Sequence, residues 1–316
     1  MHMRKFGRTG WKVSEIGFGG WAIGGDAFGN SYGATDDEVS KAALRRALEL
    51  GVNLIDTADI YGHGHSEALI GEVLRDWTGA QPYVVTKGGV NFYRKDDTLE
   101  QDWTPFALAH AVQQSLIRLR RETLDLFLLM NPPVEELERL RVWDTLEALQ
   151  RGGKIHHYGV SVAEPADGVW LLENDAPVTA IEVAYSLFYQ GATTDLLPLA
   201  RRKKVAILAR EPLANGFLAG VHGSESVFPE GDIRASLPLE YVTAMAETAE
   251  RLRFLTDGDG RTPAQAAIRF VLDDPAVACV VAGAKTPAQV EENVAAVSVA
   301  AVTEAERDRI AEVFSE

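Results

Sequence analysis

Eight short apolar runs, each followed by turn residues and a longer amphipathic segment, constrain the fold of this chain more than any other feature. The runs are SEIGFGG, VNLIDTAD, YVVTKGG, LDLFLLM, HHYGVSV, AIEVAYS, VAILARE and ACVVAGA. Runs that are apolar almost throughout are typical of parallel strands buried on both faces. Between them lie segments with the helical spacing of apolar residues, such as 37–50 and 135–151. Eight strand and helix pairs without a linker predict an α/β fold, a single (β/α)8 TIM barrel domain over residues 1–316.

The segments outside this alternation predict how the barrel is closed and where it binds a ligand. The stretch RKFGRTGWKVSEI has turn residues at 7–10, and we expect it to form an N-terminal β-hairpin that closes the barrel bottom. Long irregular stretches at 21–36, 88–104 and 214–238 follow the first, third and seventh predicted strands. They are therefore expected to lie over the C-terminal mouth of the barrel, where a small-molecule substrate would be enclosed.

Composition and charge exclude several classes of protein. Apolar residues make up 46% of the 316 positions and no run of eighteen occurs, so we expect a soluble globular protein without a membrane span. The net charge of −15 argues against nucleic-acid binding, and the basic run at 201–204 is expected to lie at a helix end. The N-terminal segment lacks the apolar stretch of a signal peptide, and the lone Cys279 cannot support a disulfide framework. The cytoplasm is the expected compartment, with the protein a monomer or homo-oligomer.

The glycine-rich stretch GFGGWA at 17–22 matches the G-x-G-x-x-[GA] pattern of dinucleotide-binding loops. A loop of that kind opens a helix at once, whereas the next predicted helix here begins near Asp36. We therefore interpret these glycines as part of a strand and a tight loop at the barrel mouth. The doubly wound fold thereby loses its main support.

Polar side chains at the C-terminal ends of barrel strands point into the active site. Asp56 ends the second predicted strand, Tyr61 lies in the loop that follows, and Lys87 ends the third. As structural alternatives, Asp56 could bind backbone donors in a turn and Tyr61 could be a rim aromatic. A lysine on a buried strand, however, must find an anion or water, because an unpaired buried ammonium is costly. We expect Lys87, between Asp56 and the Tyr61 hydroxyl, to lower the Tyr61 pKa and make Tyr61 a general acid.

Six stretches resemble, in this order and over nearly the whole chain, the aldo-keto reductase superfamily. They are IDTADIYGHGHSE, VVTKGG, LDLFLLMNPP, YGVSV, REPLANGFLAG and VAGAKTPAQVEENV. The resemblance implies a TIM barrel that binds NADP(H) without a Rossmann domain. It also implies hydride transfer from the nicotinamide to a carbonyl, with a tyrosine donating the proton. Asp56, Tyr61 and Lys87 match three of the four catalytic positions of that superfamily.

The fourth catalytic position of the superfamily is a histidine, and Met130 occupies it here. A histidine can donate a hydrogen bond to the substrate oxygen, whereas a thioether is at most a weak acceptor. The alternative interpretation is that Met130 only fills space. Asn131, His63 or His65 could supply the missing donor, although Asn131 is disfavoured because successive strand residues point to opposite faces.

The resemblance also implies the cofactor contacts, and no metal site is predicted. Lys285 and Thr286 follow the eighth strand, where barrels often bind phosphate, and Lys285 would hold the 2′-phosphate of NADP. Thr286 could also be the N-cap of the helix that begins at Pro287, and the two roles are compatible. The complete set of predicted cofactor-binding residues is Gly20, Trp21, Asp56, Ser161, Glu182, Arg210, Pro212, Leu213, Gly216, Leu218, Gly283, Lys285, Thr286, Gln289, Glu292 and Asn293.

Several positions near the expected nicotinamide depart from the commonest pattern of the superfamily. Ser161 matches the carboxamide contact, but Val162 stands where an asparagine is frequent and Glu182 where a glutamine is frequent. Arg210 replaces an aromatic residue that stacks on the nicotinamide ring in many members, and a planar guanidinium can stack too. Together with Met130, these departures indicate a subgroup with a reshaped site.

The leading hypothesis is an NADPH-dependent oxidoreductase that acts on a small carbonyl or sugar-like substrate. Tyr61 would be the acid, tuned by Lys87 and Asp56, and Met130 would alter the binding of the substrate oxygen. One alternative is the reduction of a conjugated C=C or a C=N bond. Another is a cofactor-sensing or partner-binding subunit with little turnover, which the retained Asp56, Tyr61 and Lys87 disfavour.

Overall fold

The computed structural model describes residues 1–28, 31–93, 99–258 and 260–315. Within these residues, eight strands form a closed barrel in the order β10-β11-β12-β3-β4-β5-β8-β9, and all the pairings are parallel. The strands are β3 (Ile16–Gly19), β4 (Leu54–Asp56), β5 (Tyr83–Gly88), β8 (Leu124–Met130), β9 (Ile155–Ser161), β10 (Ala180–Ala184), β11 (Ala206–Arg210) and β12 (Val277–Gly283). Each predicted run overlaps one of them, and only β9 and β12 begin one residue before their runs. The predicted TIM barrel is thus confirmed.

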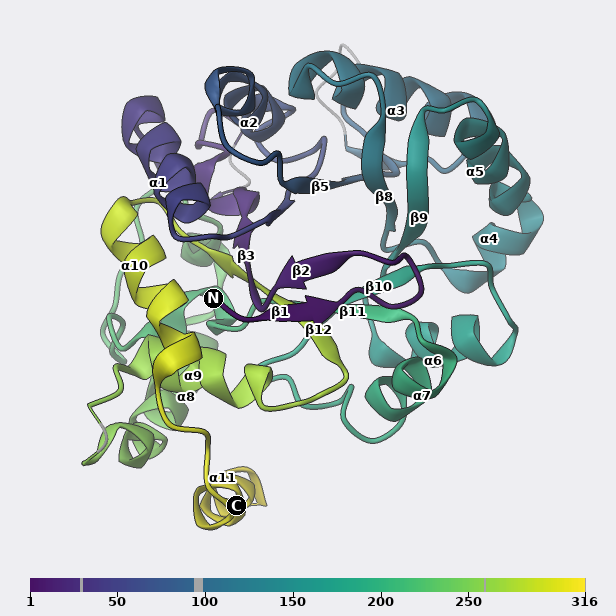
Figure 1. Cartoon of the computed structure of the whole chain (residues 1–316). Coiled ribbons are helices and arrows are strands. Elements are labelled where there is room, and N and C mark those ends of the chain that lie inside the picture. Colours follow the sequence, from purple (N-terminus) through teal and green to yellow (C-terminus); the bar gives the residue numbers. More distant parts are fainter. Residues whose placement is uncertain (29–30, 94–98, 259, 316) are drawn as a thin grey trace.

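Helices surround the barrel (Figure 1). They are α1 (Asp37–Glu49), α2 (His65–Asp76), α3 (Pro105–Leu119), α4 (Val134–Arg139), α5 (Val142–Arg151), α6 (Pro165–Glu173), α7 (Leu196–Lys203), α8 (Leu239–Arg251), α9 (Pro263–Leu272), α10 (Pro287–Ala295) and α11 (Glu304–Ser315). Proline opens α3, α6, α9 and α10, where its missing N–H is not needed. The segment 135–151 is two helices instead of the one expected, because Arg141 takes a left-handed conformation with φ of 50° between them.

Two hydrophobic cores follow from the alternation of side chains along each strand. On β8, Phe127 and Leu129 belong to the outer core between the barrel and its helices. Leu126 and Leu128 belong to the inner core that fills the barrel. Because side chains two residues apart share a face, the residue after Leu129 continues the inward series. Met130 therefore lies at the top of the barrel interior.

The N-terminal hairpin closes the bottom of the barrel, as predicted. Strands β1 (Met3–Lys5) and β2 (Lys12–Ser14) pair antiparallel and cross the barrel in Figure 1. Phe6 and Val13 are fully buried in the inner core. Trp11 stacks on Tyr83, the first residue of β5, with ring centroids 4.3 Å apart. These contacts place the hairpin at the N-terminal ends of the strands and leave the other end for a ligand.

The predicted long loops lie at the C-terminal mouth, because they follow β3, β5 and β11. They carry η1 (Gly20–Ile23), the small hairpin of β6 (Val90–Asn91) and β7 (Glu100–Gln101), η2 (Ala214–Ala219) and η3 (Ile233–Ser236). Positions 29–30 and 94–98 of these loops lie outside the described residues. The first and third loops touch, since the Ile233 N–H donates to Ser31 O at 2.8 Å and the Tyr32 hydroxyl donates to Asn215 Oδ1 at 2.7 Å.

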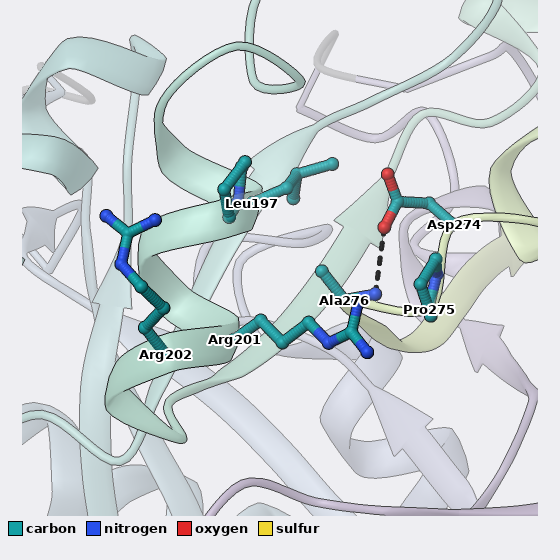
Figure 2. A pocket seen from close by; sticks show the side chains of 7 residues that line it. Leu197, Arg201, Arg202, Asp274, Pro275 and Ala276 are labelled. Atoms are coloured by element: carbon teal, nitrogen blue, oxygen red, sulfur yellow. Dashed lines mark hydrogen bonds between the residues drawn. The ribbon is translucent and has the colours of Figure 1, made fainter.

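A surface hollow lies at the opposite end of the molecule (Figure 2). It is lined by Leu197, Pro198, Arg201, Arg202, Asp274, Pro275 and Ala276. Its walls are α7 and the turn before β12, where Asp274 Oδ1 accepts a hydrogen bond from the Ala276 N–H at 2.8 Å. This turn leads into the N-terminal end of a barrel strand, so the hollow is remote from the mouth. Among the helices that the structure describes, none is long and apolar enough to cross a membrane.

Candidate active site

Lys87 lies at the centre of a buried polar cluster at the barrel mouth. Its ammonium donates to both Asp56 oxygens at 2.6 and 2.7 Å and to Thr57 O at 3.0 Å. It also lies 3.3 Å from the Tyr61 hydroxyl. Lys87, Asp56 and Tyr61 are 1%, 3% and 8% exposed, so solvent screens these interactions little. The structure thus brings together the three polar residues that the sequence singled out.

The local backbone explains how Tyr61 reaches Lys87. Asp56 ends β4, and the pairing of β4 with β5 continues beyond it because the Asp59 N–H donates to Lys87 O at 3.1 Å. The chain then turns back, and Gly62 has φ of 60°. A Cβ on Gly62 would lie 1.9 Å from Gly24 O, so only glycine fits at this turn. The loop from β3 is therefore packed directly against the loop that carries Tyr61.

Lys87 acts to lower the Tyr61 pKa, as predicted, but the net lowering that we expected does not occur. Burial raises the pKa of the Tyr61 phenol and outweighs the Lys87 ammonium, which lowers it. The sequence could not show how deeply the ring is buried. Its consequence is that Tyr61 stays protonated at neutral pH, the state that a proton donor requires.

Glu182 joins this cluster from β10. It was expected among the cofactor contacts, but its Oε2 lies 3.2 Å from the Lys87 ammonium without the geometry of a hydrogen bond. Burial, and then the Glu182 charge, raise the pKa of Asp56 to about 7. Burial works against the charged form of Lys87, yet Asp56 and Glu182 outweigh it and raise the Lys87 pKa. Two carboxyl groups thus share one ammonium.

Met130 faces the same mouth at the end of β8, where it is only partly buried. It packs with Trp21, Val90 and Phe92 against an apolar cluster of Ala58, Ile60 and Tyr61. The Trp21 ring lies 5.1 Å from the Tyr61 ring. Met130 therefore belongs to a wall of apolar and aromatic side chains that also includes Tyr61, the residue expected to donate the proton.

The alternative donors occupy different surroundings. His65 Nε2 contacts Asp37 Oδ1 at 2.8 Å on the exposed side of α1, away from the cluster. The His63 ring stacks on Phe28 at 3.9 Å and lies 4.8 Å from Phe92, so it belongs to the rim of the mouth. Asn131 has φ of 47°, a sharp bend directly after β8, so strand alternation no longer fixes where its side chain points. Strand alternation was the reason for disfavouring Asn131 as the hydrogen-bond donor, and this bend removes that reason.

The predicted nicotinamide contacts form the ends of neighbouring strands. Ser161 ends β9 and is paired with both Met130 of β8 and Glu182 of β10. Arg210 ends β11, where its guanidinium donates to Val162 O at 3.2 Å and pairs with Glu211. The predicted residues that follow are Pro212 and Leu213, then Gly216 and Leu218 within η2. On the other side, Gly20 and Trp21 open η1 and Gly283 ends β12.

The predicted contacts to the adenosine end lie around the start of α10. Lys285 Nζ donates to Tyr32 O at 2.5 Å and lies 3.4 Å from the carbonyl oxygens of Gly33 and Ala34. The Thr286 hydroxyl accepts from the Gln289 N–H at 3.3 Å, which confirms Thr286 as the N-cap of α10. Gln289 Oε1 in turn accepts from the Lys285 N–H at 2.7 Å. Asn293 and Glu292 lie one turn further along α10, and Asn293 Nδ2 donates to Gly283 O at 3.1 Å.

The site has unpaired polar atoms that suit a nicotinamide cofactor. Trp21 Nε1, Asn131 Oδ1 and Glu182 Oε2 are buried without a hydrogen-bond partner in the part of the chain that the structure describes. Buried polar atoms are normally paired, so a bound group with an amide or hydroxyls would satisfy them. Lys285 adds a cation on a loop that follows a barrel strand, the place where barrels bind phosphate. These residues fit a dinucleotide laid across the mouth.

Comparison with known proteins identifies the family. The sequence model of the Aldo/keto reductase family matches residues 15–314, so the chain belongs to this family. Aldo-keto reductase YhdN of Bacillus subtilis (strain 168) is 30% identical over 90% of this chain and 85% of its own length. The NADH-specific methylglyoxal reductase of Escherichia coli (strain K12) is 28% identical over 93% of this chain and 92% of its own. The chain is therefore an oxidoreductase of the aldo-keto reductase family, whose members use nicotinamide cofactors.

A solved structure supports the same assignment. The glycerol dehydrogenase AKR11B4 from Gluconobacter oxydans superposes with a TM-score of 0.84 at 28% identity. The match covers 99% of this chain and 95% of that one. The described residues thus have the same overall fold as this enzyme along nearly the entire chain.

Proposed function

We propose that this protein is an NADP(H)-dependent oxidoreductase that transfers hydride between the nicotinamide and a small carbonyl or sugar-like substrate. The observation that supports it most is the buried contact of Lys87 with Asp56 and the Tyr61 hydroxyl. Burial of this trio costs free energy that folding alone does not require. Such an arrangement, at the C-terminal mouth of a barrel, is typical of a catalytic site.

Each residue of the trio has a defined task in the proposed reduction. Tyr61 donates its phenolic proton to the substrate oxygen, and its raised pKa keeps that proton in place until the oxygen becomes more basic. The Lys87 ammonium, 3.3 Å away, stabilises the phenolate that remains. Asp56 binds two of the three ammonium protons and so fixes the position of Lys87. NADPH held by the residues of the mouth would supply the hydride.

The remaining residues of the mouth would bind the cofactor and orient the substrate. Ser161 and Arg210 would hold the nicotinamide end, and Lys285 would pair with the 2′-phosphate. Trp21 and Met130 form an apolar wall beside Tyr61 that keeps water from the reacting carbon. One relative is named as NADH-specific and another as an NADP(+) enzyme, so the choice of cofactor varies in this family. We propose NADP for this protein because Lys285 can pair with the 2′-phosphate. We place the activity in the cytoplasm, in a monomer or homo-oligomer.

A second candidate function is the reduction of a conjugated C=C or a C=N bond. Met130 favours it, because its thioether offers no hydrogen bond to a carbonyl oxygen and packs within an apolar cluster. A binding subunit with little turnover is the third possibility, and it would not need the buried trio.

One experiment separates these functions. NADPH consumption is followed over a panel of small aldehydes, sugars, enones and imines, with the parent protein and Tyr61→Phe. We expect turnover with the parent and a loss of about 10²–10⁴ in the variant, with NADPH binding nearly intact by fluorescence. A parent that binds NADPH but consumes none with any substrate would support the binding subunit. A Phe variant that keeps more than about half of the activity would show that Tyr61 is not the acid.

A further inference from the structure

The polar cluster at the mouth contains more acidic than basic groups. The charged groups that act on Asp56 are Glu182, Lys87 and Arg210. Arg210 is already paired with the carboxylate of Glu211. Lys87 therefore faces two carboxyl groups alone, and the side chains of Asp56 and Glu182 are only 4% and 1% exposed.

Folding does not explain the second carboxyl group. Both Asp56 oxygens accept hydrogen bonds from Lys87, and Thr57 O accepts a third. Glu182 Oε2 lies 3.2 Å from the same ammonium but is not hydrogen-bonded to it. A buried carboxylate with so little compensation destabilises a protein, whereas a neutral glutamine of the same shape would not. A ligand that carries positive charge would compensate it.

The proposed reaction brings such a charge to this place. The proton of Tyr61 and the hydride must reach the same substrate group, so the hydride-carrying ring must lie within about 7 Å of the Tyr61 oxygen. Glu182 contacts Lys87, which contacts Tyr61, so its carboxylate is in the same small volume. A nicotinamide ring is positively charged when oxidised and neutral when reduced. The Glu182 charge therefore distinguishes the two forms.

We propose that Glu182 supplies the negative charge that makes this site bind the oxidised cofactor in preference to the reduced one. The inference rests on the proposed function, which it deepens by assigning a residue that determines cofactor specificity. At a separation of about 8 Å and an effective dielectric constant of about 20, one unit charge changes the relative affinity about thirtyfold. Glu182 acts on the charge of the ring and donates no group to the substrate.

The test measures dissociation constants by tryptophan fluorescence for NADP⁺ and NADPH, and for NAD⁺ and NADH. The parent should bind the oxidised form of a pair at least as tightly as the reduced form. Glu182→Gln, which keeps the shape and removes the charge, should shift the ratio about tenfold or more toward the reduced form. Glu182→Asp, which keeps the charge, should stay within about threefold of the parent. Glu147→Gln, on α5 at a carboxylate that is 47% exposed, should change the ratio little.

The outcomes separate the inference from the proposed function. A folded Glu182→Gln protein that binds both forms with the parent ratio overturns the inference and leaves the proposed function in place. A parent that binds the reduced form more than about tenfold more tightly also overturns it, and this measurement needs no variant. If the parent binds neither pair, the proposed function itself is wrong. Thermal unfolding and circular dichroism establish that each variant is folded before its constants are compared.

Discussion

Exchanging Met130 for histidine tests what the methionine does at the mouth. Met130 continues the inward series of β8 and packs against the apolar cluster that contains Tyr61. A histidine here would place an N–H donor in the wall next to the proton donor. In carbonyl reduction, negative charge grows on the substrate oxygen, and a donor aimed at that oxygen stabilises the transition state. Met130→His should therefore accelerate the reduction of simple aldehydes.

The expected magnitude follows from the surroundings of Met130. A preorganised donor at such a position contributes about 10²–10³ in rate. Two features reduce this figure. The site is apolar and partly buried, which favours the neutral imidazole, a weaker donor than the imidazolium. The Trp21 and Phe92 rings also pack in the same cluster as the flexible Met130 side chain, so the imidazole N–H would not be ideally aligned with the substrate oxygen. We expect a gain of about an order of magnitude or more.

The same exchange should have the opposite effect on the preferred substrate of the parent. If the mouth is shaped for a conjugated, imine-bearing or bulky group, the imidazole crowds it, and turnover falls while aldehyde reduction rises. Both rates are measured as kcat/KM on the panel described above. Met130→Leu is the control, because it keeps an apolar side chain of similar volume and adds no donor. If histidine leaves both rates unchanged, position 130 does not face the reacting atoms and the reasoning fails.

Two further predictions concern charge. Lys285→Ala should reduce the preference for NADPH over NADH roughly tenfold to a hundredfold, since a charged hydrogen bond contributes about 1.5–3 kcal/mol, and equal affinities in the parent would refute the assignment. The Asp56 pKa of about 7 exceeds the ordinary aspartate value of 3.8, so the folded protein binds more protons than the unfolded chain between these pH values and loses stability as the pH rises through them. Urea unfolding should therefore show that the unfolding free energy of Asp56→Asn, relative to that of the parent, is larger at pH 8 than at pH 5. The same difference at both pH values would contradict this.

The alternation of apolar runs with amphipathic segments was enough to predict the barrel. Strand spacing also placed Asp56 and Lys87 on adjacent strands, because consecutive parallel strands are neighbours in a barrel. The split of 135–151 into two helices was not predictable, since the left-handed conformation of Arg141 has no sequence signal of the glycine kind. Contacts across the mouth were not predictable either. The hydrogen bond from Lys285 to Tyr32 O, for example, depends on how loops distant in the sequence pack together.

Glu182 shows why the chemistry of a site is harder to predict than its residues. The sequence places a carboxylate near the nicotinamide, but only the tilt of the strands decides that it reaches Lys87 across the barrel. Once that contact exists, it changes the proton affinity of Asp56, Lys87 and Tyr61 together. The expected net lowering of the Tyr61 pKa failed mainly because the ring is buried, although Lys87 lowers that pKa as expected.

The unusual residues of this mouth form one connected row. Met130 is paired with Ser161, which is paired with Glu182 on the next strand. Arg210, one strand further, donates to the carbonyl of Val162. Residues in contact are energetically coupled, so the effects of exchanging them do not add. We propose that Met130 and Glu182 belong to one site, in which the binding of the substrate oxygen and the binding of the cofactor depend on each other.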